Sequence, residues 1–116
     1  MITIYHNPRC RKSREGLEIV EQSGLPYQVV EYLKHPLNEA GIKDLLHKLG
    51  PDAQSLIRKN EALWKEQFRG RDLSDTDLIS ALAAHPILME RPVVVCGEQA
   101  VIGRPPSKIS ELLAKA

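Results

Sequence analysis

Cysteine, aromatic residues and long apolar runs are all scarce in this sequence of 116 residues. Two cysteines cannot build a multi-disulfide scaffold, and with four scattered histidines they form no metal-ligand cluster, so we expect a reduced compartment and no metal site. Aromatic side chains make up only 4%, which argues against a stacking surface for nucleic acid. Because no apolar run approaches membrane-spanning length and the N-terminus lacks a signal-peptide pattern, we expect a cytoplasmic protein without membrane attachment.

An excess of charge of one sign is also missing, because 16 basic and 15 acidic side chains give a formal net charge of +1. This balance excludes a general polyanion-binding protein. The length suits a single domain over residues 1–116. Positive charge is nevertheless concentrated around one cysteine, Cys10, which has four basic neighbours: Arg9, Arg11, Lys12 and Arg14.

The first third of the chain predicts a strand, a helix and a second strand. β-Branched and aromatic residues form a run over 2–6 that stops at Asn7-Pro8, and a helix from about Cys10 to Ser23 should follow. The second strand is expected over 27–32. This order favours a parallel pair of strands joined by a right-handed crossover.

The remainder predicts a helical insert over about 37–85 and then a second strand pair. Four helices are expected in the insert: one capped by Asn38 and ending at Gly50, then Ala53–Lys59, Ala62–Phe68 and one capped near Ser74. After the insert, strands over 92–96 and 100–102 should form a hairpin, and Ser107 should cap a final helix. The result is an α/β fold, with βαβ and ββα halves sharing a four-stranded mixed sheet.

Cys10 is the candidate nucleophile, because it is predicted at the start of a helix. Free backbone N–H groups and the positive end of the helix dipole stabilise a thiolate there. The neighbouring cations, and a Ser13 hydroxyl that can reach back toward the sulfur, should lower the pKa of the thiol further. The same amides suit a tetrahedral oxyanion, so sulfur could attack the central atom of a bound anion.

Other interpretations of Cys10 fit the residues less well. A structural cysteine usually has apolar surroundings, which this one lacks. A dithiol oxidoreductase would need Cys-x-x-Cys, but residue 13 is serine, so a second molecule must supply the resolving thiol. A low-molecular-weight phosphatase loop would need Cys-x5-Arg, and Gly16 stands at the arginine position.

Four motifs in the chain, in order and with similar spacing, resemble those of the glutaredoxin-coupled arsenate reductases, the ArsC type. They are residues 5–14, residues 56–60, residues 85–95 and Gly103-Arg104-Pro105. The resemblance implies a thioredoxin/glutaredoxin-like fold with a helical insert. It also implies reduction of arsenate without a bound cofactor, glutathione as the cosubstrate that resolves the thiol adduct, and glutaredoxin as the partner that regenerates the enzyme.

The resemblance also implies roles for individual residues. Cys10 becomes the nucleophile, and three arginines, whose forked donors suit an oxyanion, become its ligands: Arg58, Arg91 and Arg104. Supporting roles in lowering the thiol pKa or ordering the loop fall to His6, Asn7, Ser13 and Arg14. The Arg91-Pro92 peptide bond is expected to be cis.

The sequence leaves open the roles of Cys96 and of the basic residues next to Cys10, and it allows two other functions. Cys96 lies in a valine-rich strand and is interpreted as a core thiol. Arg9, Arg11 and Lys12 replace the small neutral residues of the family; they could strengthen anion capture, or dock glutathione carboxylates or an acidic partner. The alternatives are an Spx-type transcription regulator that binds RNA polymerase, for which Cys-x-x-Cys is usual, and a monothiol glutathione-dependent reductase of another substrate such as a protein mixed disulfide.

Overall fold

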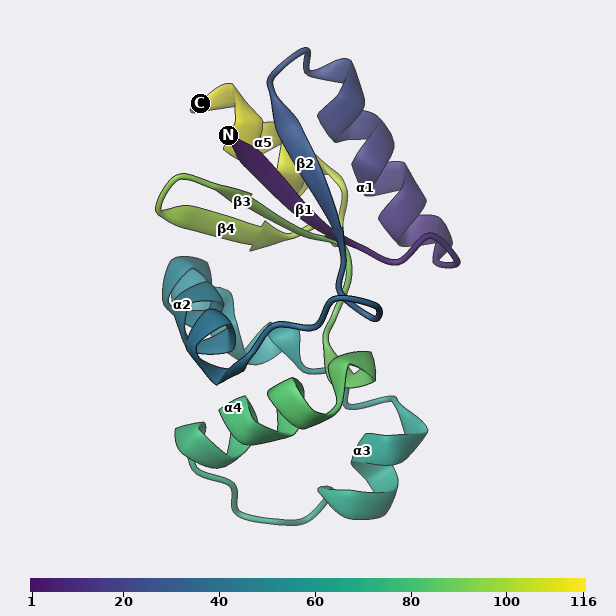
Figure 1. Cartoon of the computed structure of the whole chain (residues 1–116), viewed down its shortest axis with the longest axis vertical. Helices are drawn as coiled ribbons and strands as arrows, with labels where there is room; N and C mark the ends of the chain where they lie inside the picture. The colour runs from purple at the N-terminus through teal and green to yellow at the C-terminus, as the bar shows by residue number, and fades with distance from the viewer.

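The computed structural model describes all residues from 1 to 116 and contains one four-stranded mixed sheet (Figure 1). Its strands are β1 (Ile2–His6), β2 (Tyr27–Glu31), β3 (Val93–Cys96) and β4 (Gln99–Ile102). The strand order is β2-β1-β3-β4, with β1 parallel to β2 and both other pairs antiparallel. The predicted α/β fold with βαβ and ββα halves is therefore confirmed.

Helices cover both faces of this sheet because its strands alternate their apolar side chains. One face presents Ile4 and Val94 to α1 (Arg11–Gln22) and α5 (Ser107–Ala114). The opposite face presents Val93 and the neighbouring strand residues to α2 (Glu39–Leu49) and the rest of the insert. Two separate apolar clusters result, one on each side of the sheet, and Figure 1 shows α2 and α1 on opposite sides of the strands.

The insert between β2 and β3 is helical, as predicted, but one of its helices differs. After α2 it contains η1 (Gly50–Leu56), α3 (Ala62–Gln67), α4 (Asp75–Ala84) and η2 (Pro86–Leu88). Instead of a helix over 53–59, the chain forms a 3-10 turn and becomes extended at Ile57. The reason is long-range pairing, because Ile57 forms an isolated antiparallel bridge with Met89 and the Arg58 amide donates to the Leu88 carbonyl at 2.8 Å.

The predicted helix caps were right in two cases and wrong in one. Asn38 caps α2 by accepting from the Gly41 amide at 2.8 Å, and Ser74 caps α4 in a capping box with Asp77. Ser107 is instead the first residue of α5, since Pro106 occupies the cap position. A short helical turn already begins before Ser107, because the Lys108 amide donates to the Pro105 carbonyl.

Gly16 allows α1 to lie directly against the segment that carries Pro92. A Cβ atom at position 16 would lie 2.6 Å from Pro92 Cγ and 3.0 Å from Ile109 Cδ1. The proline ring cannot rotate away as a flexible side chain would. The distance between the start of α1 and the residues around Pro92 therefore depends on this glycine.

We expect Gly16→Ala to lower the free energy of unfolding by about 1 kcal/mol. Alanine gains about 1 kcal/mol in helix propensity, but overpacking a close contact costs about 1–3 kcal/mol. Urea unfolding measures the difference. The pair Glu18→Ala and Glu18→Gly, on the exposed face of the same helix, gives the propensity contribution alone. A Gly16→Ala protein as stable as the wild type would contradict the close packing.

Candidate active site

Cys10 occupies the N-cap position of α1, at the end of the loop that follows β1. Its backbone is extended, with φ −96° and ψ 122°, and its side chain is half-buried. The Cys10 amide donates to the Asn7 carbonyl at 3.0 Å, which closes the loop. Arg104 Nη2 donates to the sulfur at 3.7 Å. The predicted location of the thiol at a helix N-terminus is confirmed.

The pKa of Cys10 lies below the ordinary value for a thiol. Burial alone would raise this pKa, but hydrogen bonds from the backbone N–H groups of Ser13 and Lys12, together with the charge and side-chain contact of Arg91, outweigh burial. These groups stabilise the anion and not the neutral thiol. The fraction of thiolate at neutral pH is therefore greater than for a free cysteine.

The Ser13 hydroxyl does not bind the sulfur, contrary to our expectation. The side chain is fully buried, its Oγ lies 2.7 Å from His6 Nδ1, and it accepts from the Asn7 amide at 2.9 Å. These two polar groups would lack a partner if the hydroxyl turned toward Cys10. The backbone amide of Ser13, and not its side chain, faces the thiolate.

His6 is a neutral component of this buried network. Burial lowers the pKa of His6, and this effect exceeds the opposing influence of the Glu31 carboxylate. A neutral imidazole supplies no positive charge to the thiolate. Any influence of His6 on Cys10 must therefore act through the hydrogen bond that fixes Ser13.

Asn7 and Arg14 hold the loop before Cys10 without a side-chain hydrogen bond to the sulfur. Asn7 Oδ1 accepts from the Arg9 amide at 3.0 Å, and Arg14 Nη1 donates to the Pro8 carbonyl at 2.9 Å. The other basic neighbours are exposed, and two of them pair with Glu15: Arg11 at 3.4 Å and Lys12 at 3.9 Å.

The three predicted arginines meet in one polar pocket of about 450 Å³. Arg58 follows the bridge between Ile57 and Met89, which holds the end of η1 beside the segment before β3. Arg91 and Arg104 each precede a cis proline, Pro92 and Pro105. The sequence predicted the cis bond before Pro92 but not the one before Pro105. The remaining pocket residues are mainly polar: Gln54, Ser55, Ile57, Lys59, Asn60 and Glu90.

Glu90 lies among these arginines and was missed by the sequence analysis. Its Oε1 atom is 3.2 Å from Arg91 Nη1, 3.3 Å from Arg104 Nε and 3.9 Å from Arg58 Nε. A second carboxylate, that of Glu61, contacts Arg58 alone, with Oε2 3.2 Å from Nη1. The signal was present in the sequence, because Glu90 is the only acidic residue in the fragment from His85 to Val95.

One donor in the pocket has no partner. Arg91 Nε is buried and makes no hydrogen bond, whereas the Nη1 atom of the same side chain donates to Glu90. An unsatisfied buried donor costs about 1–3 kcal/mol. An acceptor atom in reach of Arg91 would recover that energy, which is what an oxyanion supplies.

Cys96 lies at the far end of the sheet from Cys10. It is paired in register with Ile2 at the start of β1, whereas Cys10 follows the end of that strand. The strand alone separates these ends by about 13 Å. Cys96 packs against the apolar cluster under α1 and α5, and both thiols are free.

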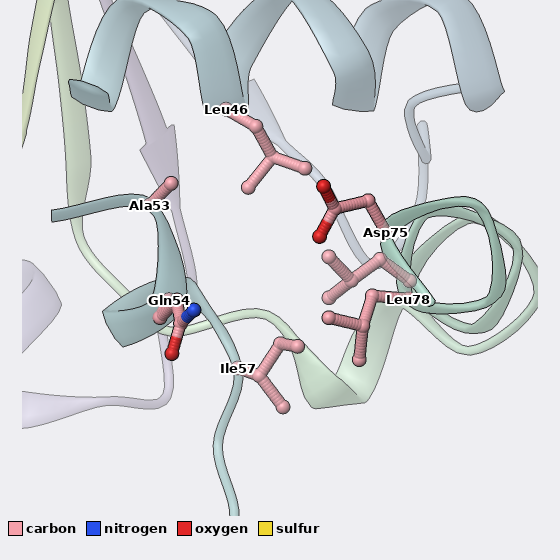
Figure 2. A pocket seen from close by; sticks show the side chains of 7 residues that line it. Leu46, Ala53, Gln54, Ile57, Asp75 and Leu78 are labelled. Atoms are coloured by element: carbon pink, nitrogen blue, oxygen red, sulfur yellow. The ribbon is translucent and has the colours of Figure 1, made fainter. Parts of the chain in front are cut away.

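A second pocket differs from the one that contains the arginines. A smaller pocket of about 50 Å³ lies between α2, η1 and α4 (Figure 2). It is lined mainly by apolar side chains, with Gln54 and Asp75 as its only polar residues. The chain contains no group of three side chains that could hold a metal ion, and none of its helices has the length and hydropathy needed to cross a bilayer.

Comparison with known proteins identifies relatives along nearly the whole chain. The model of the ArsC family matches residues 5–112. The arsenate reductase of Neisseria meningitidis serogroup B is 40% identical over 114 residues, covering 97% of each chain. An Escherichia coli K12 protein named "Uncharacterized protein YfgD" is 45% identical over 97% of this chain and 96% of its own. The solved arsenate reductase from Vibrio cholerae is 44% identical, with a TM-score of 0.89 over 95% of each chain.

Proposed function

The chain belongs to the ArsC family, and on that premise we propose that it is an arsenate reductase whose Cys10 thiolate attacks the arsenic atom of arsenate. One observation carries the proposal: a thiol with a lowered pKa touches Arg104 at the edge of a pocket that also contains Arg58 and Arg91. Nucleophile and anion-binding groups are thus adjacent. The proposed unit is a single domain over residues 1–116 in the cytoplasm.

The arginines are proposed to bind and polarise the oxyanion. A guanidinium stays charged at neutral pH and presents planar, forked donors that match tetrahedral anions. The unpaired Nε of Arg91 supplies one buried donor, and Arg104 can contact the oxyanion and the sulfur at once. These charges offset the negative charge that accumulates when a thiolate attacks an anion.

The proposed reaction consumes one external thiol before regeneration. The Cys10 thiolate forms an S–As bond, and one arsenate oxygen takes up protons and leaves as water. A glutathione thiolate then attacks the Cys10 sulfur; an S–S bond forms, the S–As bond breaks, and its electron pair stays on arsenic. Arsenic is thereby reduced from the +5 to the +3 state, and a glutaredoxin thiol reduces the mixed disulfide on Cys10.

Two features of this chain support an external resolving thiol. Residue 13 is a serine whose hydroxyl is held by His6 and Asn7, and Cys96 lies at the other end of β1. No second sulfur is therefore close enough to form a disulfide with Cys10. Glutathione as cosubstrate and glutaredoxin as partner meet this need, and the proposal requires no bound cofactor.

A coupled assay tests the function. The protein is mixed with arsenate, glutathione, glutaredoxin, glutathione reductase and NADPH, and NADPH oxidation is followed. We expect arsenate-dependent oxidation and, when glutaredoxin is omitted, a glutathione adduct on the Cys10 peptide by mass spectrometry. Activity on a glutathionylated protein without arsenate turnover would favour the monothiol alternative. Capture of the RNA polymerase α C-terminal domain without any turnover would favour the regulator.

We expect Cys96→Ser to leave arsenate turnover within about two-fold of the wild type. The substitution changes a partly buried thiol in the cluster under α1 and α5, so its main cost is a stability loss of about 1 kcal/mol. The same coupled assay measures turnover, and Cys96→Ala controls for the new hydroxyl. A loss of regeneration in both variants would identify Cys96 as a resolving thiol.

A further inference from the structure

A single carboxylate oxygen contacts all three arginines of the pocket. Glu90 Oε1 lies within 3.3 Å of Arg91 Nη1 and Arg104 Nε, and 3.9 Å from Arg58 Nε. The Glu90 side chain is itself only 22% exposed. Its backbone is held as well, because the Glu90 amide donates to the Leu56 carbonyl at 2.6 Å beside the Ile57–Met89 bridge.

We propose that Glu90 is a positioning residue, whose carboxylate pairs with one nitrogen of each arginine and so directs the remaining donors toward the oxyanion beside Cys10. This inference rests on the proposed function. Arg91 Nη1 donates a hydrogen bond to the Glu90 carboxylate, whereas Arg104 Nε and Arg58 Nε lie at ion-pair distance from it. The N–H of Arg104 Nε itself donates to the Arg91 carbonyl at 2.8 Å, which ties Arg104 to the residue next to Glu90. Two arginine nitrogens that Glu90 does not contact are Arg104 Nη2, which donates to the Cys10 sulfur, and Arg91 Nε, which has no hydrogen-bond partner.

The arginines need such a partner because they repel one another. Three like charges share a pocket of about 450 Å³ and repel one another. Glu61 pairs with Arg58 and the Arg91 carbonyl accepts from Arg104 Nε, but only Glu90 places a negative charge against all three. A carboxylate between them makes the close arrangement stable before substrate arrives. Arginine alignment is then in place at the moment of attack, as electrostatic preorganisation requires.

The same carboxylate opposes the binding of any anion, and this gives the proposal a distinctive signature. The Glu90 charge repels both the oxyanion and the Cys10 thiolate, so it weakens ground-state binding while it aligns the donors. Removing the charge but not the shape should therefore strengthen anion binding, favour the thiolate and yet slow the reaction. If Glu90 had only a structural role, its removal would weaken anion binding, disfavour the thiolate and slow the reaction.

Other groups also set the charge on the thiol. The hydroxyl of buried Tyr32 interacts with the Cys10 charge, as do Arg91 and Arg104. The groups that act on Cys10 come from four segments: the α1 amides of Lys12 and Ser13, Tyr32 after β2, Arg91 before β3, and Arg104 after β4. Glu90 contacts two of them, Arg91 and Arg104. None of these apart from Glu90 is altered in the test below.

The test compares Glu90→Gln with Glu61→Gln in the full chain. Glu61 is a matched control, because its side chain is 21% exposed and it contacts Arg58 but neither of the other arginines. The rate of Cys10 alkylation by iodoacetamide, followed across pH, gives the thiol pKa. Protection of Cys10 from alkylation by arsenate, without glutathione, gives the Kd of arsenate, and the coupled assay gives kcat.

For Glu90→Gln we expect a thiol pKa lower by roughly half a unit to one unit and arsenate binding tighter by about three- to ten-fold. We expect kcat to fall at least about ten-fold, since the donors lose their alignment. For Glu61→Gln, the changes in thiol pKa, log Kd for arsenate and log kcat should each be less than half of those for Glu90→Gln. Glu90→Asp keeps the charge, so its thiol pKa should match the wild type while kcat falls.

A Glu90→Gln protein with wild-type pKa, Kd and kcat would overturn the inference, as would weaker arsenate binding together with a raised thiol pKa. If circular dichroism shows that Glu90→Gln does not fold, Glu90→Asp decides, because a changed thiol pKa there would overturn the inference. Failure of the proposed function looks different: the wild type itself would then show an ordinary thiol pKa and no protection by arsenate.

Discussion

Replacing Cys10 with serine is expected to abolish arsenate reduction, with kcat falling at least about 10³-fold. A serine hydroxyl remains protonated at neutral pH and is a far poorer nucleophile than a thiolate. In addition, a glutathione thiolate cannot form a disulfide with a serine oxygen, so the electron pair of the bond to arsenic would have no route onto arsenic. The groups that lower the Cys10 pKa, from the α1 amides to Arg91, would have no anion to stabilise in the variant. The coupled assay measures this loss.

The control for Cys10→Ser is arsenate binding, because the three arginines and their pocket remain. We expect the variant to bind arsenate within about five-fold of the wild-type Kd by calorimetry, and to retain its circular dichroism spectrum. Binding without turnover would separate the nucleophile from the anion site. Turnover that survives in Cys10→Ser would end the proposed mechanism, whatever the binding result.

Arg91→Ala is expected to reduce kcat/KM for arsenate by about 10²- to 10³-fold. The substitution removes a buried, unpaired donor that we propose binds the oxyanion, and with it a charge proposed to stabilise the transition state. It also raises the Cys10 pKa, since Arg91 is one of the groups that lower it. The rising limb of the pH–rate profile should therefore move to higher pH. Steady-state kinetics between pH 5 and 9 measure both effects.

Two matched variants isolate the role of Arg91. Arg91→Lys keeps a positive charge but loses the planar, forked donors, so it should recover only a small part of the lost rate. Arg9→Ala removes an exposed cation that is adjacent to Cys10 in sequence and lies outside the pocket. Its kinetics should stay within about two-fold of the wild type. Equal losses in Arg9→Ala and Arg91→Ala would show that general positive charge matters, and not the built site.

Those elements that depend on local signals could be predicted from the sequence. The run over 2–6 and the hairpin around Gly97 form strands as predicted, and Asn38 caps α2. The helix predicted over 53–59 was wrong because Ile57 pairs with Met89, a partner 32 residues away. No local propensity records that pairing. The thioredoxin-like fold was therefore predictable, while the turn that carries Arg58 was not.

The candidate site divides in the same way. Cys10 could be recognised from helix-start chemistry, and the arginines only through motifs shared with a family, since each alone resembles a surface residue. The Ser13 hydroxyl was assigned to the wrong partner because the burial of His6 and of the Asn7 amide is a tertiary property. Glu90 was missed for a related reason: its significance comes from three side chains that converge from separate segments.

The central claim is that one sulfur is held as an anion beside a site for a second anion. The most direct measurement is the rate of Cys10 alkylation by iodoacetamide, followed by intact mass across pH, with arsenate or with sodium chloride at equal ionic strength. We predict an apparent thiol pKa below that of free cysteine and slower alkylation with arsenate. An ordinary alkaline pKa together with unchanged alkylation in arsenate would contradict the account.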